Sequence, residues 1–253
     1  MEFQGKTAFV TGAGSGIGRA TAVALAERGA RVALLGRTLG KIERAADAVR
    51  DAGGEALVLE GDVAEDEAQR AALAAIGERW GGLDHVVAAA GINGVWAPVA
   101  EIGPEEWDRT IRTNLRGAYL TLHHAVPAMT RSGGGSAVIV SSIIGTRDFG
   151  TTGATAYAAT KAAQLAMAKM LALEVAPEGV RVNAVCPGRI DTNIEASTET
   201  RGVDDGPAPD IPLTGGAAGA PADVAEAVLF LLSDRARHVT GTPLFVDGAE
   251  SLP

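Results

Sequence analysis

The stretch "TGAGSGIG" at residues 11–18 decides the fold, because it joins two elements of different kinds. Before it, "KTAFVTG" (6–12) is a short apolar run typical of a β-strand. After it, "GIGRATAVALAERG" (16–29) has the pattern of a helix closed by Gly29. Small residues in such a turn let the backbone approach a phosphate, and the helix N-terminus offers free N–H groups. The stretch therefore predicts a phosphate-binding turn at the first strand–helix junction of an α/β domain.

The glycines of this turn narrow the kind of nucleotide that it can hold. Gly12, Gly16 and Gly18 are spaced G-x-x-x-G-x-G, which differs from the plain G-x-G-x-x-G dinucleotide pattern. The Gly-Lys-Ser/Thr ending of a P-loop kinase or GTPase is missing, so that class is excluded. We expect Gly18 to let the helix pack closely on the sheet. The alternative is a glycine-rich turn that binds no ligand.

Short apolar runs and helical patterns alternate along the rest of the chain. Further strands are expected at 31–36, 55–63, 84–91, 136–142, 180–188 and 242–248. Helices are expected at 41–54, 65–82, about 104–131, 156–176 and 222–234. Because the strands are continuous apolar runs, the sequence predicts one Rossmann-type domain, a doubly wound parallel α/β sheet of about seven strands with helices on both faces. The polar stretch 191–221 is too long for an ordinary connection and is predicted to be a substrate lid.

Composition excludes several classes of protein. A chain of 253 residues with 47% hydrophobic residues fits a single globular domain, and the net charge of −9 argues against nucleic-acid or anionic-membrane partners. The single cysteine, Cys186, allows no disulfide within the chain. With neither a signal-peptide pattern nor a long apolar run, a cytoplasmic protein is expected. A metal site is not expected, because the four histidines lack helical spacing with a nearby acid.

The end of the second predicted strand bears on the choice of cofactor. A dinucleotide site that prefers NAD carries an acid at this place, which binds the ribose 2′-hydroxyl. Here the sequence reads "LLGRT", with Gly36 followed by Arg37. Arg37 can pair with a 2′-phosphate, so the sequence favours NADP(H) over NAD(H). The alternative is that Arg37 points into solvent, as surface arginines usually do.

Tyr157 and Lys161 in "AYAATK" (156–161) form a candidate catalytic pair. Positions i and i+4 of a helix share a face. A free phenol has a pKa near 10, which is a poor value for acid–base work at neutral pH. A cation at about 4 Å, with an effective dielectric constant near 20, contributes about 4 kcal/mol, enough to lower a phenol pKa by about three units. The alternative is that Tyr157 is a half-buried packing residue.

Taken together, the motifs resemble the classical short-chain dehydrogenases/reductases, and the resemblance covers essentially the whole chain. It rests on an ordered set: the turn at 11–18, "AAAG" at 88–91, Asn114, Ser142, the Tyr157-x-x-x-Lys161 pair and "PG" at 187–188. The resemblance implies an NAD(P)-dependent oxidoreductase acting on CH–OH or C=O groups. We expect a carbonyl reductase that also works in reverse as an alcohol dehydrogenase.

The resemblance also implies a role for each motif residue. Tyr157 would donate the proton to a substrate carbonyl, and Lys161 would lower its pKa and bind the nicotinamide ribose. Ser142 would hydrogen-bond the carbonyl, and Asn114 would hold a water in a proton relay through Lys161. Besides Tyr157 and Lys161, the residues expected to contact the cofactor are Gly12, Ser15, Gly16, Ile17, Gly18, Arg37, Asp62, Val63, Ala90, Gly91, Pro187, Gly188, Ile190 and Thr192.

Two positions depart from the family pattern. Ala88 stands where many members have an asparagine that braces the central strands, which puts a structural hydrogen bond in doubt. The segment from Ser142 to Tyr157 is slightly longer than the commonest spacing, which would reshape the substrate mouth. Candidates for the substrate pocket are Trp96, Ile144, Arg147 and Phe149.

The helix expected at 156–176 is apolar on more than one side, which indicates a further partner surface. By resemblance, this helix and the one at about 104–131 form the interface of a homotetramer. Two alternatives to a general carbonyl reductase remain open. One is a 3-oxoacyl-carrier-protein reductase, and the other is a non-catalytic sensor or scaffold that binds NADP(H).

Overall fold

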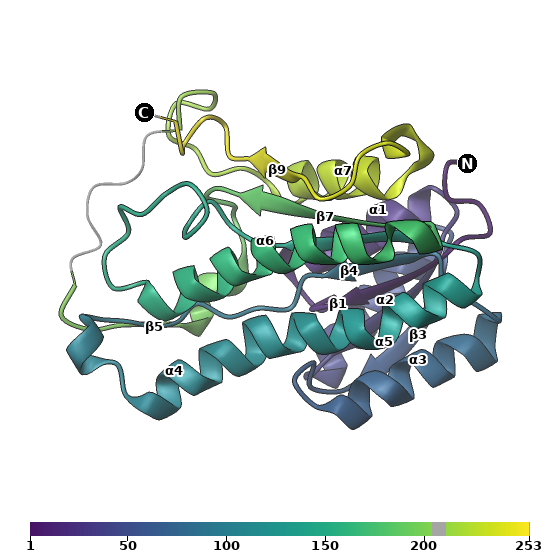
Figure 1. The fold of residues 1–253 in the computed structure, drawn as a ribbon, viewed down its shortest axis with the longest axis horizontal. Coiled ribbons are helices and arrows are strands. Elements are labelled where there is room, and N and C mark those ends of the chain that lie inside the picture. The colour runs from purple at the N-terminus through teal and green to yellow at the C-terminus, as the bar shows by residue number, and fades with distance from the viewer. Residues whose placement is uncertain (204–210, 253) are drawn as a thin grey trace.

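The computed structural model describes residues 1–203 and 211–252, and at its centre is a sheet of seven parallel strands (Figure 1). In their order across the sheet, the strands are β3 (Glu55–Glu60), β2 (Arg31–Gly36), β1 (Thr7–Thr11), β4 (His85–Ala88), β6 (Gly135–Val140), β7 (Val180–Pro187) and β9 (Pro243–Val246). The chain steps outward in one direction from β1 and in the other from β4. This reversal places a crevice beyond the carboxyl ends of the strands, and the predicted doubly wound sheet is confirmed.

Helices cover both faces of this sheet. One face carries α1 (Gly16–Glu27), α2 (Leu39–Asp51) and α7 (Pro221–Leu232), and the other carries α3 (Asp66–Trp80), α5 (Gly117–Arg131) and α6 (Thr155–Val175). Figure 1 shows α5 and α6 crossing the front of the sheet. Within the described ranges, every helix is too short or too polar to cross a membrane.

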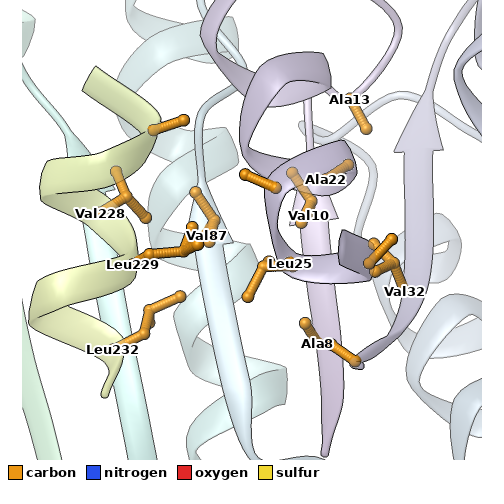
Figure 2. Packing of buried hydrophobic residues seen from close by; sticks show 14 of the residues in the cluster. Ala8, Val10, Ala13, Ala22, Leu25, Val32, Val87, Val228, Leu229 and Leu232 are labelled. Carbon is orange, nitrogen blue, oxygen red and sulfur yellow. The ribbon is translucent and has the colours of Figure 1, made fainter. Parts of the chain in front are cut away.

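The core between the sheet and α1 and α7 shows why the strands are continuously apolar. Figure 2 shows Leu25 of α1 and Leu229 of α7 lying over Val10 of β1 and Val87 of β4. All four side chains are buried, and burying such a side chain stabilises the fold by about 1.5–3 kcal/mol. Since α3, α5 and α6 bury the opposite face, the central strands have no solvent-facing side on which polar residues would alternate.

The long helix expected at about 104–131 is interrupted in its middle. It consists of α4 (Pro104–Thr110), the π-helical turn η2 (Ile111–Arg116) and α5. The N–H of Gly117 bonds to the carbonyl of Arg112, five residues earlier, instead of the usual four. Turns of this kind often mark functional sites, and Asn114 lies within this one.

A second, two-stranded sheet was not predicted. In it, β5 (Gly94–Trp96) pairs in parallel with β8 (Thr198–Thr200), which belongs to the predicted lid. The N–H of Arg201 donates to the carbonyl of Trp96 at 2.9 Å, and Asn93 Nδ2 donates to Thr198 Oγ1 at 2.8 Å. These bonds fix the first part of the lid to the loop that follows β4. Lid residues 204–210 lie outside the described residues.

A buried histidine begins β4. His85 is 8% exposed, and its ring meets the ring of Phe3 edge-on with the centroids 5.3 Å apart. Among the described residues, its Nδ1 has no hydrogen-bond partner. Burial lowers the pKa of His85 to about 4, so the fold holds this side chain neutral.

We expect His85 to make the fold less stable in mild acid. The unfolded chain takes up a proton on His85 near pH 6.5, whereas the folded chain does so only near pH 4. The unfolded state therefore binds more protons between these values, and stability falls by up to about 1.4 kcal/mol for each pH unit as the pH drops from 6.5 to 4. Urea unfolding of wild type and His85→Phe at pH 7 and pH 5 measures this, and the loss should be smaller in the variant. The exposed His238, changed to Gln, is the control; an identical loss in His85→Phe and wild type would refute the expectation.

Candidate active site

The predicted site residues gather at one edge of the sheet. The phosphate turn follows β1, and Ala90 and Gly91 follow β4. Ser142 lies two residues beyond β6, and Pro187 ends β7. Because all seven strands are parallel, their carboxyl ends meet at this edge, which brings together residues that lie far apart in the sequence.

The glycines of the phosphate turn allow three segments to meet closely. Gly12 has φ +66°, and a Cβ there would lie 2.7 Å from Ala90 Cα. A Cβ on Gly18 would lie 2.5 Å from the carbonyl oxygen of Gly12, so this glycine lets α1 begin directly against the turn. A Cβ on Gly16 would lie 3.2 Å from Thr192 Cγ2. The structure therefore places the turn beside Ala90 and beside Thr192, as predicted for a shared cofactor site.

The N-terminus of α1 fits the pyrophosphate of a dinucleotide. Ser15 is the N-cap, and within the described chain its side chain makes no capping hydrogen bond. The first turn, Gly16–Arg19, includes Ile17 and brings no acidic residue of its own. The first N–H groups of the helix and the positive end of its dipole are therefore available to an anion.

The four predicted catalytic residues lie near one another in the structure. Lys161 Nζ lies 5.4 Å from the centroid of the Tyr157 ring, and the Ser142 side chain is close enough to Tyr157 to act on its pKa. A Cβ on Gly91 would lie 3.7 Å from Lys161 Nζ and 3.5 Å from Asn114 Oδ1, so Gly91 lies between these two buried polar side chains. The arrangement can pass a proton between buried groups and a substrate oxygen.

Burial decides the protonation of the catalytic pair. It raises the pKa of Tyr157 above its ordinary value, and the hydrogen bond with Ser142 opposes this only in part. It also lowers the pKa of Lys161 to about 8. The expectation that Lys161 brings the pKa of Tyr157 close to neutrality is wrong for this structure. Desolvation of the phenol is the largest effect on its pKa, and Lys161 Nζ donates its hydrogen bond to the carbonyl of Val140, at 2.9 Å.

Asn114 links the loop after β4 to α6. Its Oδ1 accepts from the N–H of Ile92 at 2.8 Å, and its Nδ2 donates to the carbonyl of Ile92 at 2.9 Å. Nδ2 also donates to Thr160 Oγ1 at 3.2 Å. The side chain is thus held by protein groups on both sides, and its role toward a relay water stays a prediction.

An open cavity of about 690 Å³ lies beyond the ends of β2 and β3. Arg37 and Asp62 line it, whereas Val63 packs under Gly117, where an added Cβ would lie 2.6 Å from Val63 Cγ2. The far wall of this cavity was not predicted from the sequence. Arg109, Arg112 and Arg116 could have indicated it, because they have the spacing of one helix face. The wall residues are Glu105, Asp108, Arg109, Ile111, Arg112, Thr113 and Arg116.

The segment after β7 is held by the end of the chain. The N–H of Gly188 donates to the carbonyl of Val246 at 3.1 Å, and Glu250 accepts from the N–H of Arg189 at 2.6 Å. Ile190 forms a β-bridge with Gly219. The residues predicted to contact the nicotinamide therefore lie on a segment that hydrogen bonds hold in place. The sequence analysis did not predict that Glu250 contributes to this.

The four candidates for the substrate pocket separate in the structure. The ring of Trp96 faces Tyr157 with the centroids 6.4 Å apart. Ile144 is half-buried, and Phe149 is 78% exposed. The guanidinium of Arg147 stacks on the ring of Phe245 at 3.6 Å. Trp96 is thus the candidate that the structure places against Tyr157.

Comparison with known proteins supplies the family. Residues 12–249 match the model of a family described as enoyl-(acyl carrier protein) reductase. The chain is 40% identical over 248 residues to the cis-4-hydroxycyclohexanecarboxylate dehydrogenase of Sinomonas cyclohexanicum, which covers 97% of this chain and 96% of that one. The chain belongs to the classical short-chain dehydrogenase/reductase family. It is accordingly an NAD(P)-dependent oxidoreductase of alcohols and ketones, and the predicted family and enzyme class are confirmed.

Solved structures of short-chain dehydrogenases/reductases agree with this fold over its full length. A 3-ketoacyl-ACP reductase from Sinorhizobium meliloti 1021 matches with a TM-score of 0.90 and 50% sequence identity, over 97% of this chain and 99% of that one. A 3-ketoacyl-(acyl-carrier-protein) reductase from Brucella melitensis, complexed with NADH, matches with a TM-score of 0.90 and 32% identity, over 99% of this chain and 100% of that one.

Proposed function

We propose that this protein is an NADP(H)-dependent oxidoreductase that interconverts a carbonyl compound and a secondary alcohol, with Tyr157 as general acid or base. The observation that carries the proposal is the buried group of Ser142, Tyr157 and Lys161 beside the phosphate turn. The nicotinamide, when bound, supplies or accepts the hydride. The residues of the chain then have to orient the substrate and move one proton.

In carbonyl reduction, Tyr157 donates its phenolic proton to the carbonyl oxygen while negative charge develops there. Its raised pKa keeps the phenol protonated at neutral pH, so the proton is present for donation, but it also makes the free phenol a weak acid. Ser142 donates a hydrogen bond to the same oxygen. Lys161, with a pKa of about 8, is mostly positively charged at neutral pH, and its ammonium group lies 5.4 Å from the centroid of the Tyr157 ring. Alcohol oxidation needs Tyr157 to lose its proton first, so we expect that direction to be favoured by alkaline pH.

The cofactor is assigned to three segments of the carboxyl edge. The pyrophosphate lies over the turn at 11–18, where the N-terminus of α1 is uncapped within the described chain. The adenine would be held in the cavity that Asp62 lines. The nicotinamide would be held by segment 187–192.

The preference for NADP(H) rests on the end of β2. A Cβ on Gly36 would lie 2.5 Å from Ile42 Cδ1, and Ile42 is 1% exposed, so an acid cannot enter here without moving a core side chain. Arg37, the next residue, lines the cavity. Its guanidinium can pair with a 2′-phosphate. The relative complexed with NADH keeps NAD(H) as the alternative.

Arg37→Ala is expected to raise the KM for NADPH by about 10- to 100-fold, because a hydrogen bond to a charged group contributes about 1.5–3 kcal/mol. The KM for NADH should change by less than about threefold, since NADH has no 2′-phosphate to lose a contact. Steady-state kinetics with both cofactors measure this. Arg44→Ala, an exposed arginine on α2, is the control for the change in net charge. A wild-type enzyme that prefers NADH by tenfold would contradict the assignment.

For the substrate, the proposal favours a ring-bearing secondary alcohol or ketone. The relative from Sinomonas cyclohexanicum is named for a hydroxyl on a cyclohexane ring, and the Trp96 ring beside Tyr157 offers an apolar wall to such a ring. The second candidate is 3-oxoacyl-carrier-protein reduction, favoured by the 50% identical structure. Comparing kcat/KM for cyclohexanone, linear ketones and a β-ketoacyl thioester decides between them. A thioester that wins by tenfold would replace the first candidate with the second.

The proposal also includes a substrate lid and an interface between subunits. Segment 191–221 is assigned as the substrate lid, because β8 ties it to the strand that carries Trp96. The exposed Met170 and Leu173 on α6, and Tyr119 on α5, are assigned to the interface of a homotetramer. Light scattering that gave the mass of a single chain would contradict the second assignment.

A further inference from the structure

A glutamine lies in the interior of α6 beside the catalytic pair. Gln164 has 0% exposure although its neighbours on the helix are mostly apolar. Burying an amide is costly unless its polar atoms find partners. Gln164 lies four residues after Thr160, so these two residues form a row beside the row of Tyr157 and Lys161.

The row of Thr160 and Gln164 holds Asn114 from two directions. Thr160 Oγ1 accepts from the side chain of Asn114, and Gln164 Nε2 donates to the backbone carbonyl of Asn114 at 2.7 Å. The orientation of the Gln164 amide follows from its partner, because a carbonyl can only accept. The π-helical turn η2 and α6 are therefore joined at one residue, which also lies beside Lys161 across Gly91.

The oxygen atom of the Gln164 amide differs from the nitrogen atom in its hydrogen bonding. Its Oε1 is buried and has no hydrogen-bond partner among the described residues. A buried acceptor of this kind usually has an ordered water as its partner. Tyr157 and Lys161 are 8% and 4% exposed, so a proton lost from Tyr157 has little direct contact with solvent. A polar route through the interior is needed to replace it.

We propose that Gln164 is a positioning residue for proton delivery to Lys161 and Tyr157. Its Nε2 fixes the carbonyl of Asn114, and its Oε1 accepts a hydrogen bond from a buried water between α6 and η2. This inference rests on the proposed function, because it assigns Gln164 to the proton supply of that reaction. Gln164 touches neither substrate nor cofactor, and it acts through Asn114.

Gln164→Met tests the proposal with a side chain of similar size that lacks both polar atoms. We expect kcat for carbonyl reduction to fall by about tenfold, within the range that proton transfer contributes. The KM values for ketone and NADPH should stay within about twofold. The solvent deuterium isotope effect on kcat should rise, because proton delivery becomes slower than the other steps.

Gln69→Met is the matched control. Gln69 is also a fully buried glutamine, its Nε2 donates to the carbonyl of Val63 at 3.0 Å, and its Oε1 likewise lacks a partner among the described residues. It lies on α3, away from the catalytic row. The control should lose a similar amount of thermal stability, while kcat at saturating cofactor and the isotope effect stay at wild-type values.

Gln164→Glu provides a second readout, which also serves if the methionine variant folds poorly. A protonated carboxyl can donate to the carbonyl of Asn114, whereas an ionised one cannot. Burial raises the pKa of such a carboxyl, so we expect near-wild-type kcat at low pH and a loss as the pH rises. The loss in Gln164→Glu should begin at a lower pH than any loss in wild type and Gln69→Glu.

Two results would overturn the inference. One is a Gln164→Met enzyme with wild-type kcat and isotope effect, and the other is an equal loss of kcat in Gln69→Met. Tyr157→Phe separates this failure from failure of the proposed function. If Tyr157→Phe abolishes turnover while Gln164→Met does not reduce it, Gln164 alone is excluded. If Tyr157→Phe keeps its turnover, the proposed function itself is wrong.

Discussion

Tyr157→Phe is expected to lower kcat by about 10²- to 10⁴-fold, the range that general acid–base catalysis contributes. The phenylalanine ring keeps the packing of the buried tyrosine against Trp96, so the variant should fold and remain equally stable. Removing the phenolic hydroxyl removes the proton that reduction requires. NADPH affinity, measured by fluorescence titration, should change by less than about threefold, and steady-state kinetics then give the loss in kcat.

The second tyrosine of the chain provides the matched control. Tyr119 is 48% exposed on α5, and Tyr119→Phe should leave kcat unchanged. The Tyr157 variant also tests the alternative of a non-catalytic sensor. A variant that binds NADPH, lacks turnover and still performs the biological role would support the sensor and contradict an enzymatic role.

Gly18→Ala is expected to weaken NADPH binding by at least about tenfold and to destabilise the fold by about 1–3 kcal/mol, the usual cost of overpacking. The added methyl group would lie 2.5 Å from the carbonyl oxygen of Gly12 and 2.9 Å from its carbon. Both are backbone atoms, which cannot turn aside as a flexible side chain can. The N-terminus of α1 must therefore move away from the turn that holds the phosphates. Chemical denaturation and NADPH titration measure the two effects.

Gly77→Ala separates this clash from the general effect of the substitution. Gly77 is exposed on α3, and among the described residues no atom lies within 4 Å of an added Cβ. Alanine should stabilise this helix by about 0.5–1 kcal/mol, because glycine is the more flexible residue in the unfolded chain. If both variants behaved alike, close packing at Gly18 would not explain the turn.

Sequence patterns were sufficient for the main sheet but not for the smaller features. The seven strands were predictable because each is an apolar run bounded by turn residues. The pairing of "GVW" at 94–96 with "TET" at 198–200 was not, because three-residue strands carry little pattern of their own. The π-helical turn was hidden for a related reason. One extra residue in a turn barely disturbs the helical spacing on either side of Ile111–Arg116.

The placement of Tyr157 and Lys161 on one face of a helix was predictable, whereas their protonation was not. Tyr157 and Lys161 are recognisable because a helix places positions i and i+4 on one face. The direction of the Tyr157 pKa depends on burial and on where Lys161 points, and its ammonium group bonds to Val140 instead of the phenol. Gln164 was missed for the same reason. In the sequence it is one polar residue in a helix, and only the packing of η2 against α6 gives it a partner.

The pairing of β5 with β8 has a consequence for how the enzyme admits its substrate. Trp96 stands against Tyr157, and its backbone is bonded to the same segment that is assigned as the lid. A ladder of backbone bonds transmits displacement between its strands. If segment 191–221 opens as the proposed lid, the wall of the pocket formed by Trp96 would move with it. The Trp96 side chain would return to its position beside Tyr157 each time the entrance to the pocket closes.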